Sequence, residues 1–372
     1  MDNVRGALDW ALTKPDVLAG GWLVAEIGMA WEPLGLRNEG IKRDETFLAA
    51  LPKRESLLLA RLSSPLADML LHAARTERAL ELATQAVAYA RAGGDGPTLA
   101  DALQKYALIN VGFGSRVDAE KALVEGESIP DASAYVRLQL MLARAQLSYA
   151  KGEAETAVRI FEQLRQQHRS LGNTHNEVVS VLIRAEIEHE RGQTEKAIAL
   201  TREILPQARR DREKALAGSL LVNLAGYLVA ADDLPGAIEA AYDVIGPHAR
   251  RELDDSHVAN AIEHLALVYA LRGELARASI LEGYAASAFR QLGFNRLLTC
   301  AASIAPGCSG NQGSMRADTP ISAAAMRRLS EQSLAPSPST LPVAEFAAAG
   351  FQIQERGLPQ QMQVQNHGML SG

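Results

Sequence analysis

The chain has 372 residues, enough for two or three ordinary domains or one elongated repeat array, and its composition, 47% hydrophobic but only 5% aromatic, favours helices. The net charge of -6, with both signs interspersed, excludes the strong basic field that attracts nucleic acid. Two cysteines give no disulfide framework or zinc site, and neither a membrane-length apolar run nor a signal-peptide pattern occurs, so we predict a cytoplasmic protein without a membrane partner.

A unit of about 40 residues, with a turn residue at its centre, recurs along the chain as far as Phe294. It is clearest in YAKGEAETAV at 149–158 and HERGQTEKAI at 189–198, which align on their central glycines. A small residue precedes each turn by seven positions, and another follows it by five. The turns are Gly35, Ala74, Gly114, Gly152, Gly192, Asp232 and Gly273; the small residues before them are Gly28, Ala67, Ala107, Ala145, Ala185, Ala225 and Ala266, and those after them are Gly40, Ala79, Ala119, Ala157, Ala197, Ala237 and Ala278.

Each unit is predicted to be a helical hairpin. Small side chains let two helices approach closely where they cross, and the turn residue supplies left-handed or capping geometry. The 12-residue separation of the two small positions resembles that of the tetratricopeptide (TPR) consensus. Because a single hairpin cannot bury its apolar face, neighbouring hairpins must stack. We therefore predict an all-α, right-handed superhelical solenoid of about seven TPR-like hairpins over residues 1–294, with a concave groove.

The first unit carries a second resemblance. DNVRGALDWAL at 2–12 and RNEGIKRDETFLAAL at 37–51 resemble the segment that opens the TPR-like region of bacterial NB-ARC/AAA-type ATPase transcriptional regulators. This resemblance covers about residues 2–294 and implies a sensing or interaction portion that works with an ATPase domain. Because the chain has no GxxxxGK[ST] loop and no recognisable DNA-reading module, the ATPase and DNA-binding parts of such regulators are not expected in it.

All three tryptophans, Trp10, Trp22 and Trp31, lie within the first 31 residues. They are predicted either to form the core of the first hairpin or to present an aromatic surface to an upstream domain. Both interpretations make this end of the array distinct from the other repeats.

The organisation of the sequence changes after residue 294. Residues 295–372 contain six of the 15 prolines and clusters such as APSPSTLP, without a helical period. A segment of this kind buries too little apolar surface to offset the entropy lost on ordering. We predict that 295–372 is a low-complexity, mostly disordered tail.

Catalytic motifs are not found. The sequence has no HExxH, GxSxG or CxxC pattern, and its eight histidines are scattered. His175, Glu177, Glu186 and His189 do not place two metal ligands one turn apart on one helix face. We therefore predict a protein that is not an enzyme and has no metal and no other cofactor.

The TPR frame places Gln146, Tyr149, Glu186 and His189 on the groove. These side chains form a mixed polar and apolar lining, which suits recognition of a protein segment better than chemistry. The sequence predicts a protein–protein interaction module, a sensor or scaffold from a bacterial transcriptional regulator, whose partner is a protein or peptide, including an ATPase domain. The alternative is a receptor that binds a peptide or small ligand in the groove.

Overall fold

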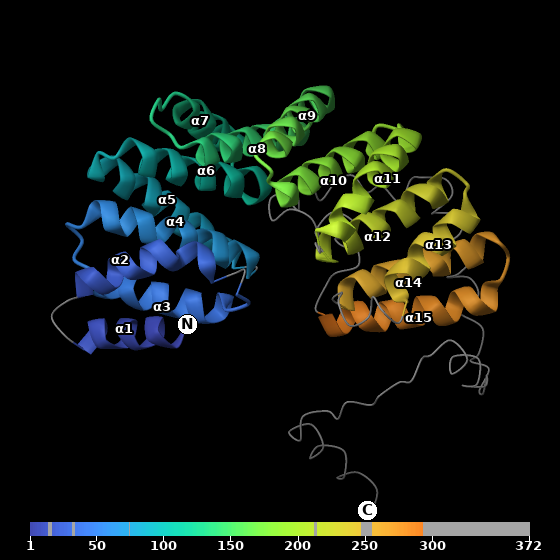
Figure 1. The fold of residues 1–372 in the computed structure, drawn as a ribbon, viewed down its shortest axis with the longest axis horizontal. Coiled ribbons are helices and arrows are strands. Elements are labelled where there is room, and N and C mark those ends of the chain that lie inside the picture. Colours follow the sequence, from blue (N-terminus) through green and yellow to red (C-terminus); the bar gives the residue numbers. More distant parts are fainter. Residues whose placement is uncertain (14–16, 32–33, 74, 212–213, 247–254, 293–372) are drawn as a thin grey trace, which may run out of the picture. The chain divides into compact units, whose positions relative to one another are not determined.

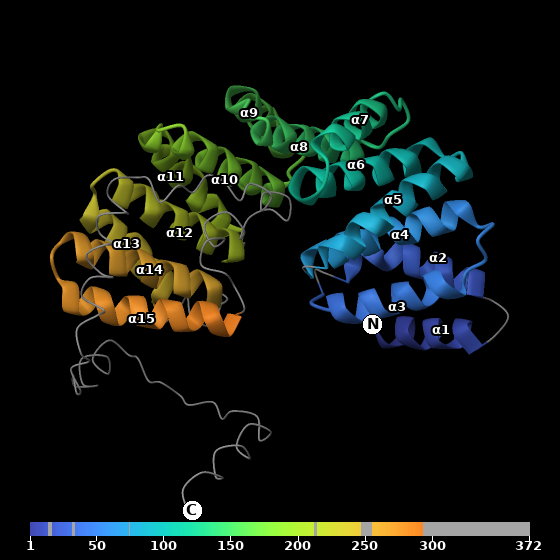
Figure 2. The ribbon, with the colours of Figure 1, turned by 180° about the vertical axis from the view of Figure 1, so that it is seen from behind.

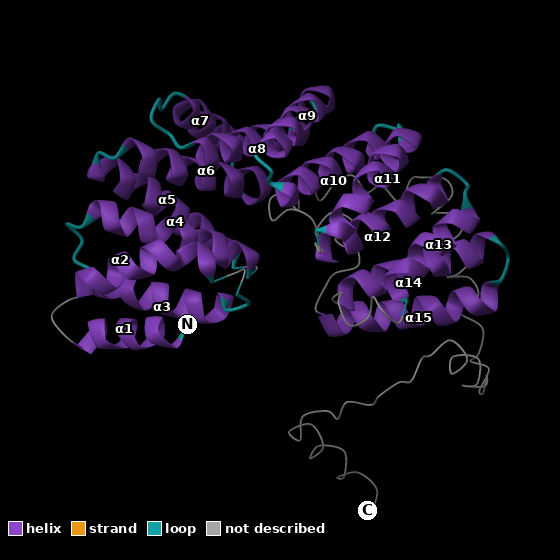
Figure 3. Ribbon diagram, in the orientation of Figure 1, coloured by secondary structure: helices purple, strands orange, loops and turns teal. Residues whose placement is uncertain are grey.

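All the regular structure in the described part of the chain is helical (Figure 1, Figure 3). The structure is a computed structural model and describes residues 1–292 apart from 14–16, 32–33, 74, 212–213 and 247–254. The turn residue Ala74, the cysteines Cys300 and Cys308 and the predicted tail lie outside the described residues. The helices are α1 (Asp2–Thr13), α2 (Val17–Ile27), the short 3-10 helix η1 (Gly28–Ala30), α3 (Arg37–Ala50), α4 (Ser56–His72), α5 (Thr76–Gly93), α6 (Gly96–Phe113), α7 (Arg116–Glu127), α8 (Ala134–Ala150), α9 (Ala154–Ser170), α10 (Thr174–Glu190), α11 (Thr194–Arg210), α12 (Lys214–Ala230), α13 (Leu234–Ile245), α14 (Asp255–Leu271) and α15 (Leu275–Leu292).

The helices after α1 pair into hairpins, as the sequence period predicts. In each pair an even-numbered first helix packs against the odd-numbered second helix that follows it, from α2 with α3 to α14 with α15. First helices also pack on the next first helix from α2 to α8 and again from α10 to α14. Both views show α12 lying between α10 and α14 (Figure 1, Figure 2). The all-α, TPR-like hairpin array is thus confirmed, and none of the described helices is long and apolar enough to cross a membrane.

The small residues that define the repeat are all buried. Every alanine of the two predicted sets is at most 3% exposed, and Gly28 and Gly40 are buried as well. At Gly40 the reason is direct, because a Cβ atom there would lie 2.5 Å from Cγ of Trp31. The helices therefore cross where the sequence places its smallest side chains, and a larger side chain at these points would have to push two helices apart.

Four of the turns share one geometry. Gly152, Gly192, Asp232 and Gly273 have φ angles of 83°, 80°, 62° and 80°. At each of them the turn residue donates its N–H to the carbonyl three positions back, and the following residue donates to the carbonyl four positions before the turn residue. This pair of bonds satisfies carbonyls that the end of a helix leaves without a partner. Left-handed geometry, which glycine adopts without steric cost, is thus confirmed for these turns.

Gly114 ends its helix differently. Its φ angle is -131°, so it does not adopt the left-handed geometry of the other turns. The side-chain Oδ1 of Asn110 accepts a hydrogen bond from the N–H of Ser115 at 3.0 Å, and Ser115 Oγ in turn accepts from the N–H of Asp118 at 3.2 Å. Side-chain capping therefore replaces the left-handed turn between α6 and α7.

Gly192→Ala is expected to destabilise the chain by about 1 kcal/mol, because an L side chain in the left-handed region costs about that much. A Cβ atom at Gly192 would meet nothing within 4 Å, so the cost would come from the backbone alone. Urea unfolding followed by circular dichroism measures the change. Asp232→Gly is the matched control, since Asp232 already bears this strain; it should not destabilise, and an equal loss in both variants would contradict the argument.

The tryptophans divide between core and surface. Trp31 is fully buried in the first hydrophobic cluster, whereas Trp10 and Trp22 are 56% and 38% exposed. The guanidinium of Arg61 lies 5.7 Å from the centre of a Trp22 ring. The core interpretation therefore holds for Trp31 alone.

Asp44 is a buried acid beside Trp31. It is 1% exposed, and its Oδ1 accepts no hydrogen bond in the described part of the chain. Burial raises the pKa of Asp44 to about 8, and the adjacent Trp31 side chain opposes this rise only in part. The folded chain therefore holds this carboxyl in its protonated form at neutral pH.

Candidate functional site on the first helices

Successive first helices meet through side chains 37 or 38 positions apart. Between α4 and α6, Lys105 Nζ lies 2.9 Å from Asp68 Oδ2, a spacing of 37 residues. Asp68 directly follows the small residue Ala67, and Lys105 lies two positions before Ala107. The same register recurs between α10 and α12 and between α12 and α14, so it defines one face of these helices. We call the side of α8, α10, α12 and α14 that carries Gln146, Tyr149, Glu186, His189, Asn223, Tyr227 and His264 the first-helix face.

Glu186 of α10 is joined to Asn223 of α12. The Nδ2 of Asn223 donates to Oε1 of Glu186 at 2.9 Å, and both side chains are half-buried. Burial raises the pKa of Glu186 to about 8, while the hydrogen bond from Asn223 opposes the rise. At neutral pH the acid is therefore largely protonated, and it remains accessible to solvent.

His189 lies one turn along α10 from Glu186 and packs against Tyr227 of α12. The two ring centroids are 4.7 Å apart and the rings are tilted by 42°. His189 Nδ1 also lies 3.1 Å from Thr194 Oγ1 at the start of α11. Burial lowers the pKa of His189, so its imidazole is neutral at neutral pH.

His264 of α14 fills the space beside Gly226 of α12. A Cβ atom at Gly226 would lie 3.1 Å from Cε1 of this ring. Burial lowers the pKa of His264 to about 4, which keeps the ring uncharged. Gly226 occupies on α12 the repeat position that Glu186 occupies on α10. The contact between α12 and α14 therefore has an imidazole where the contact between α10 and α12 has a carboxyl–amide pair.

Gln146 and Tyr149 of α8 lie where the repeat frame equates them with Glu186 and His189. Gln146 is only 5% exposed, and its Oε1 accepts no hydrogen bond in the described structure. The residue that the register places opposite it on α10 is Ile183, which has no side-chain donor. Tyr149 is half-buried at the edge of the cluster around Phe161.

The structure thus brings Glu186 and His189 together on one side of α10 and adds three partners that the TPR frame did not single out. Asn223, Tyr227 and His264 lie two positions before or after the small residue of their helix, not at the positions predicted to line a groove. The recurring separation of 37 or 38 residues is the signal that could have found them. The role of Gln146, Tyr149, Glu186 and His189 in binding stays a prediction.

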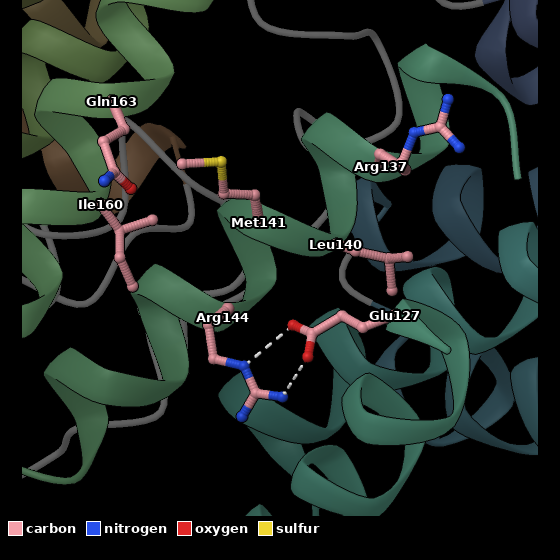
Figure 4. A pocket seen from close by; sticks show the side chains of 7 residues that line it. All are labelled: Glu127, Arg137, Leu140, Met141, Arg144, Ile160 and Gln163. Carbon is pink, nitrogen blue, oxygen red and sulfur yellow. Dashed lines mark hydrogen bonds and ion pairs between the residues drawn. The ribbon is translucent and has the colours of Figure 1, made fainter. Parts of the chain in front are cut away.

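A separate pocket of about 290 Å³ lies among α7, α8 and α9. α7 has 12 residues and α9 has 17, so the shorter helix leaves part of α8 uncovered. Arg144 spans the wall of the pocket and donates from Nε and Nη2 to the two oxygens of Glu127 at 3.0 and 2.8 Å (Figure 4). On a helix that turns about 100° per residue, Arg144 points away from Gln146. The pocket is therefore distinct from the first-helix face; its other lining residues are Arg137, Leu140, Met141, Ile160 and Gln163.

The described residues contain no group of three or more His, Cys, Asp or Glu side chains that could hold a metal ion. On the first-helix face the carboxyl of Glu186 is bound to an amide, and the imidazoles of His189 and His264 are held neutral by burial. This arrangement offers hydrogen-bonding groups and ring faces to a ligand.

Paired helices, small residues at each crossing and one register between successive first helices define a TPR-like helical-repeat solenoid. No protein-family model matches the chain, and no curated protein is similar to it in sequence. The comparison with known proteins therefore rests on solved structures.

Solved structures share the fold, including a STAND ATPase and a Rap protein. A Signal Transduction ATPase with Numerous Domains (STAND) protein with a tetratricopeptide repeat sensor, from Pyrococcus horikoshii, has a TM-score of 0.54 and 16% identity over 87% of this chain and 51% of that one. A Rap protein complexed with Competence and Sporulation Factor has a TM-score of 0.51 and 14% identity over 89% of this chain and 99% of that one. At such identities the likeness establishes the fold alone.

Proposed function

We propose that this chain is a non-catalytic interaction module that holds a segment of a partner protein on its first-helix face. The observation that carries the proposal is the set of polar and ring-bearing side chains there: Glu186 with Asn223, and His189 with Tyr227. Half-buried polar groups cost stability unless they are paired. Apolar side chains between α10 and α12 would therefore stabilise the packing of these helices as well as the polar ones do. Glu186, Asn223 and His189 stay partly accessible to solvent, which suits the recognition of a ligand.

We further propose that the module is the sensing portion of a bacterial ATPase-type regulator, with an ATPase domain as one partner. The N-terminal strings DNVRGALDWAL and RNEGIKRDETFLAAL support this origin. The fold shared with a STAND ATPase that carries a TPR sensor supports it as well. A receptor for a peptide or small ligand is the second candidate, favoured by the shared fold of the Rap protein that was solved with Competence and Sporulation Factor.

The double substitution Tyr149→Ala with His189→Ala is expected to weaken partner binding by about 2 kcal/mol or more, as truncation of central interface side chains does. The partner is first isolated by pull-down from the native host, and its affinity is then measured by calorimetry. Because His189 also contacts Tyr227 and Thr194, the variant should lose about 1 kcal/mol of stability, so binding is measured well below its melting temperature.

Tyr284→Ala is the matched control, because Tyr284 is 47% exposed on the second helix α15. It should leave binding unchanged. Equal affinities of the parent and the double variant, with both proteins folded, would place the binding surface elsewhere and overturn the proposal.

A further inference from the structure

Two acids have no cationic partner on the side of α10 that belongs to the first-helix face. Glu186 and Glu190 lie one turn apart on α10, and no lysine or arginine forms an ion pair with either of them within the described residues. Other glutamates of this helix are neutralised: Glu177 lies 2.7 Å from Arg169, and Glu188 pairs with Arg191 and Lys196. The unpaired state is therefore specific to the two acids on this face.

Gln146 gives an independent indication of a missing donor. Gln146 is only 5% exposed, yet its Oε1 accepts no hydrogen bond in the described chain. Because Gln146 occupies on α8 the position of Glu186 on α10, the repeat turns both side chains onto the same face. A buried acceptor without a donor destabilises the free protein, and an N–H group of a bound ligand would remove this cost.

The rings beside the acids do not repel a cation. Burial lowers the pKa of His189, so the imidazole next to Glu186 carries no charge at neutral pH. Tyr227, on which His189 packs, is a buried aromatic side chain. The face therefore combines acceptors with neutral rings.

Resting on the proposed function, we infer that the first-helix face binds its partner segment through a lysine or arginine side chain. The cationic group lies against Glu186 and Glu190, and an N–H of the bound segment donates to Oε1 of Gln146. Glu186 is desolvated and has no cation beside it in the described structure, so it gains more from such a cation than an exposed acid does.

This interaction has a consequence that calorimetry can follow. Burial raises the pKa of Glu186 to about 8, so this carboxyl holds a proton at pH 7, and burial also raises the pKa of Glu190. A nearby cation favours the carboxylate, so binding at pH 7 should release protons. The other titratable groups on this face are Tyr149, His189, Tyr227 and His264; the imidazoles are neutral at this pH, and a cation does not charge them.

The test selects random 12-residue peptides, displayed on phage, for binding to the full chain. The best peptide is synthesised with each basic residue kept or replaced by a neutral analogue, citrulline for arginine and norleucine for lysine. Affinities and heats are measured at pH 7 in two buffers of different ionisation enthalpy. Glu186→Gln removes the acid but keeps an acceptor for Asn223, and Glu195→Gln removes the same charge from an exposed position on α11.

We expect selected peptides to share one basic position, to release protons on binding, and to bind Glu186→Gln at least tenfold more weakly while Glu195→Gln binds as the parent does. Peptides that lose binding to the Tyr149→Ala, His189→Ala variant but have no basic position, or bind Glu186→Gln unchanged, would overturn this inference and leave the proposed function standing. If no peptide is selected, or if all selected peptides bind that double variant as tightly as they bind the parent protein, the inference and the proposed function are both overturned.

Discussion

Ala185→Leu and Ala197→Leu are each expected to lower the free energy of unfolding by about 1–3 kcal/mol. Both alanines are fully buried, on α10 and α11, the two helices of one hairpin. Leucine at either position has to displace the facing helix, because protein interiors are packed too densely to absorb three extra carbon atoms. Urea unfolding followed by circular dichroism measures the loss.

The matched control is Ala199→Leu, since Ala199 is exposed two residues along α11 from Ala197. A surface substitution of this kind should change stability by no more than about 0.5 kcal/mol. If the two buried variants unfold at the same urea concentration as the control, the helices do not cross at the small residues and the repeat frame is wrong.

Stability of the first hairpin is expected to fall as pH rises from about 4 to 8, because Asp44 is protonated in the folded chain. Its pKa is about 8 when folded and 3.8 when exposed. Between these values the folded state holds a proton that the unfolded state has released, so the free energy of unfolding falls by at most about 1.4 kcal/mol per pH unit. Below this window the full contribution is present, and above it the contribution is lost.

Asp44→Asn should remove this slope, because the amide does not titrate. All three tryptophans lie within residues 10–31, so tryptophan fluorescence during urea unfolding follows the first hairpin. Glu186, with a pKa of about 8, adds a slope of the same sign, whereas His264, with a pKa of about 4, makes stability rise with pH between about 4 and 6.5. Both are present in parent and variant, so identical slopes in the two proteins would refute a buried neutral Asp44.

The repeat was predictable because its signals are local and recur. A small residue at a helix crossing and a glycine in a left-handed turn each follow from steric requirements on a few neighbouring residues, and Ala185 with Gly192 is one instance. Gly114 departs from this pattern because the side chain of Asn110 supplies the hydrogen bond that the turn backbone supplies elsewhere. A glycine in sequence does not distinguish these two ways to end a helix.

The side of each first helix that carries Glu186 and His189 was also predictable, but their partners were not. Asn223 and Tyr227 reach those residues from another helix, so their role depends on how closely and in what register the two helices lie. The burial of Gln146 likewise depends on the packing around α8 and not on its own position in the repeat. Such contacts are set by tertiary packing, which the hydrophobic period of one helix does not specify.

The contacts between α4 and α6, between α10 and α12, and between α12 and α14 share one register but differ in chemistry, and this difference bears on the fidelity of folding. Repeats that resemble one another can dock on the wrong neighbour, which is a characteristic failure of repeat proteins. If α6 docked on α12, Lys105 would be buried against Gly226 without the carboxylate of Asp68, a costly arrangement. If α14 docked on α10, the imidazole of His264 would collide with the side chain of Glu186 where it now meets only a glycine. These contacts thus favour the native neighbouring helix over the others. The side chains that join the hairpins therefore help to set the order of the hairpins in space.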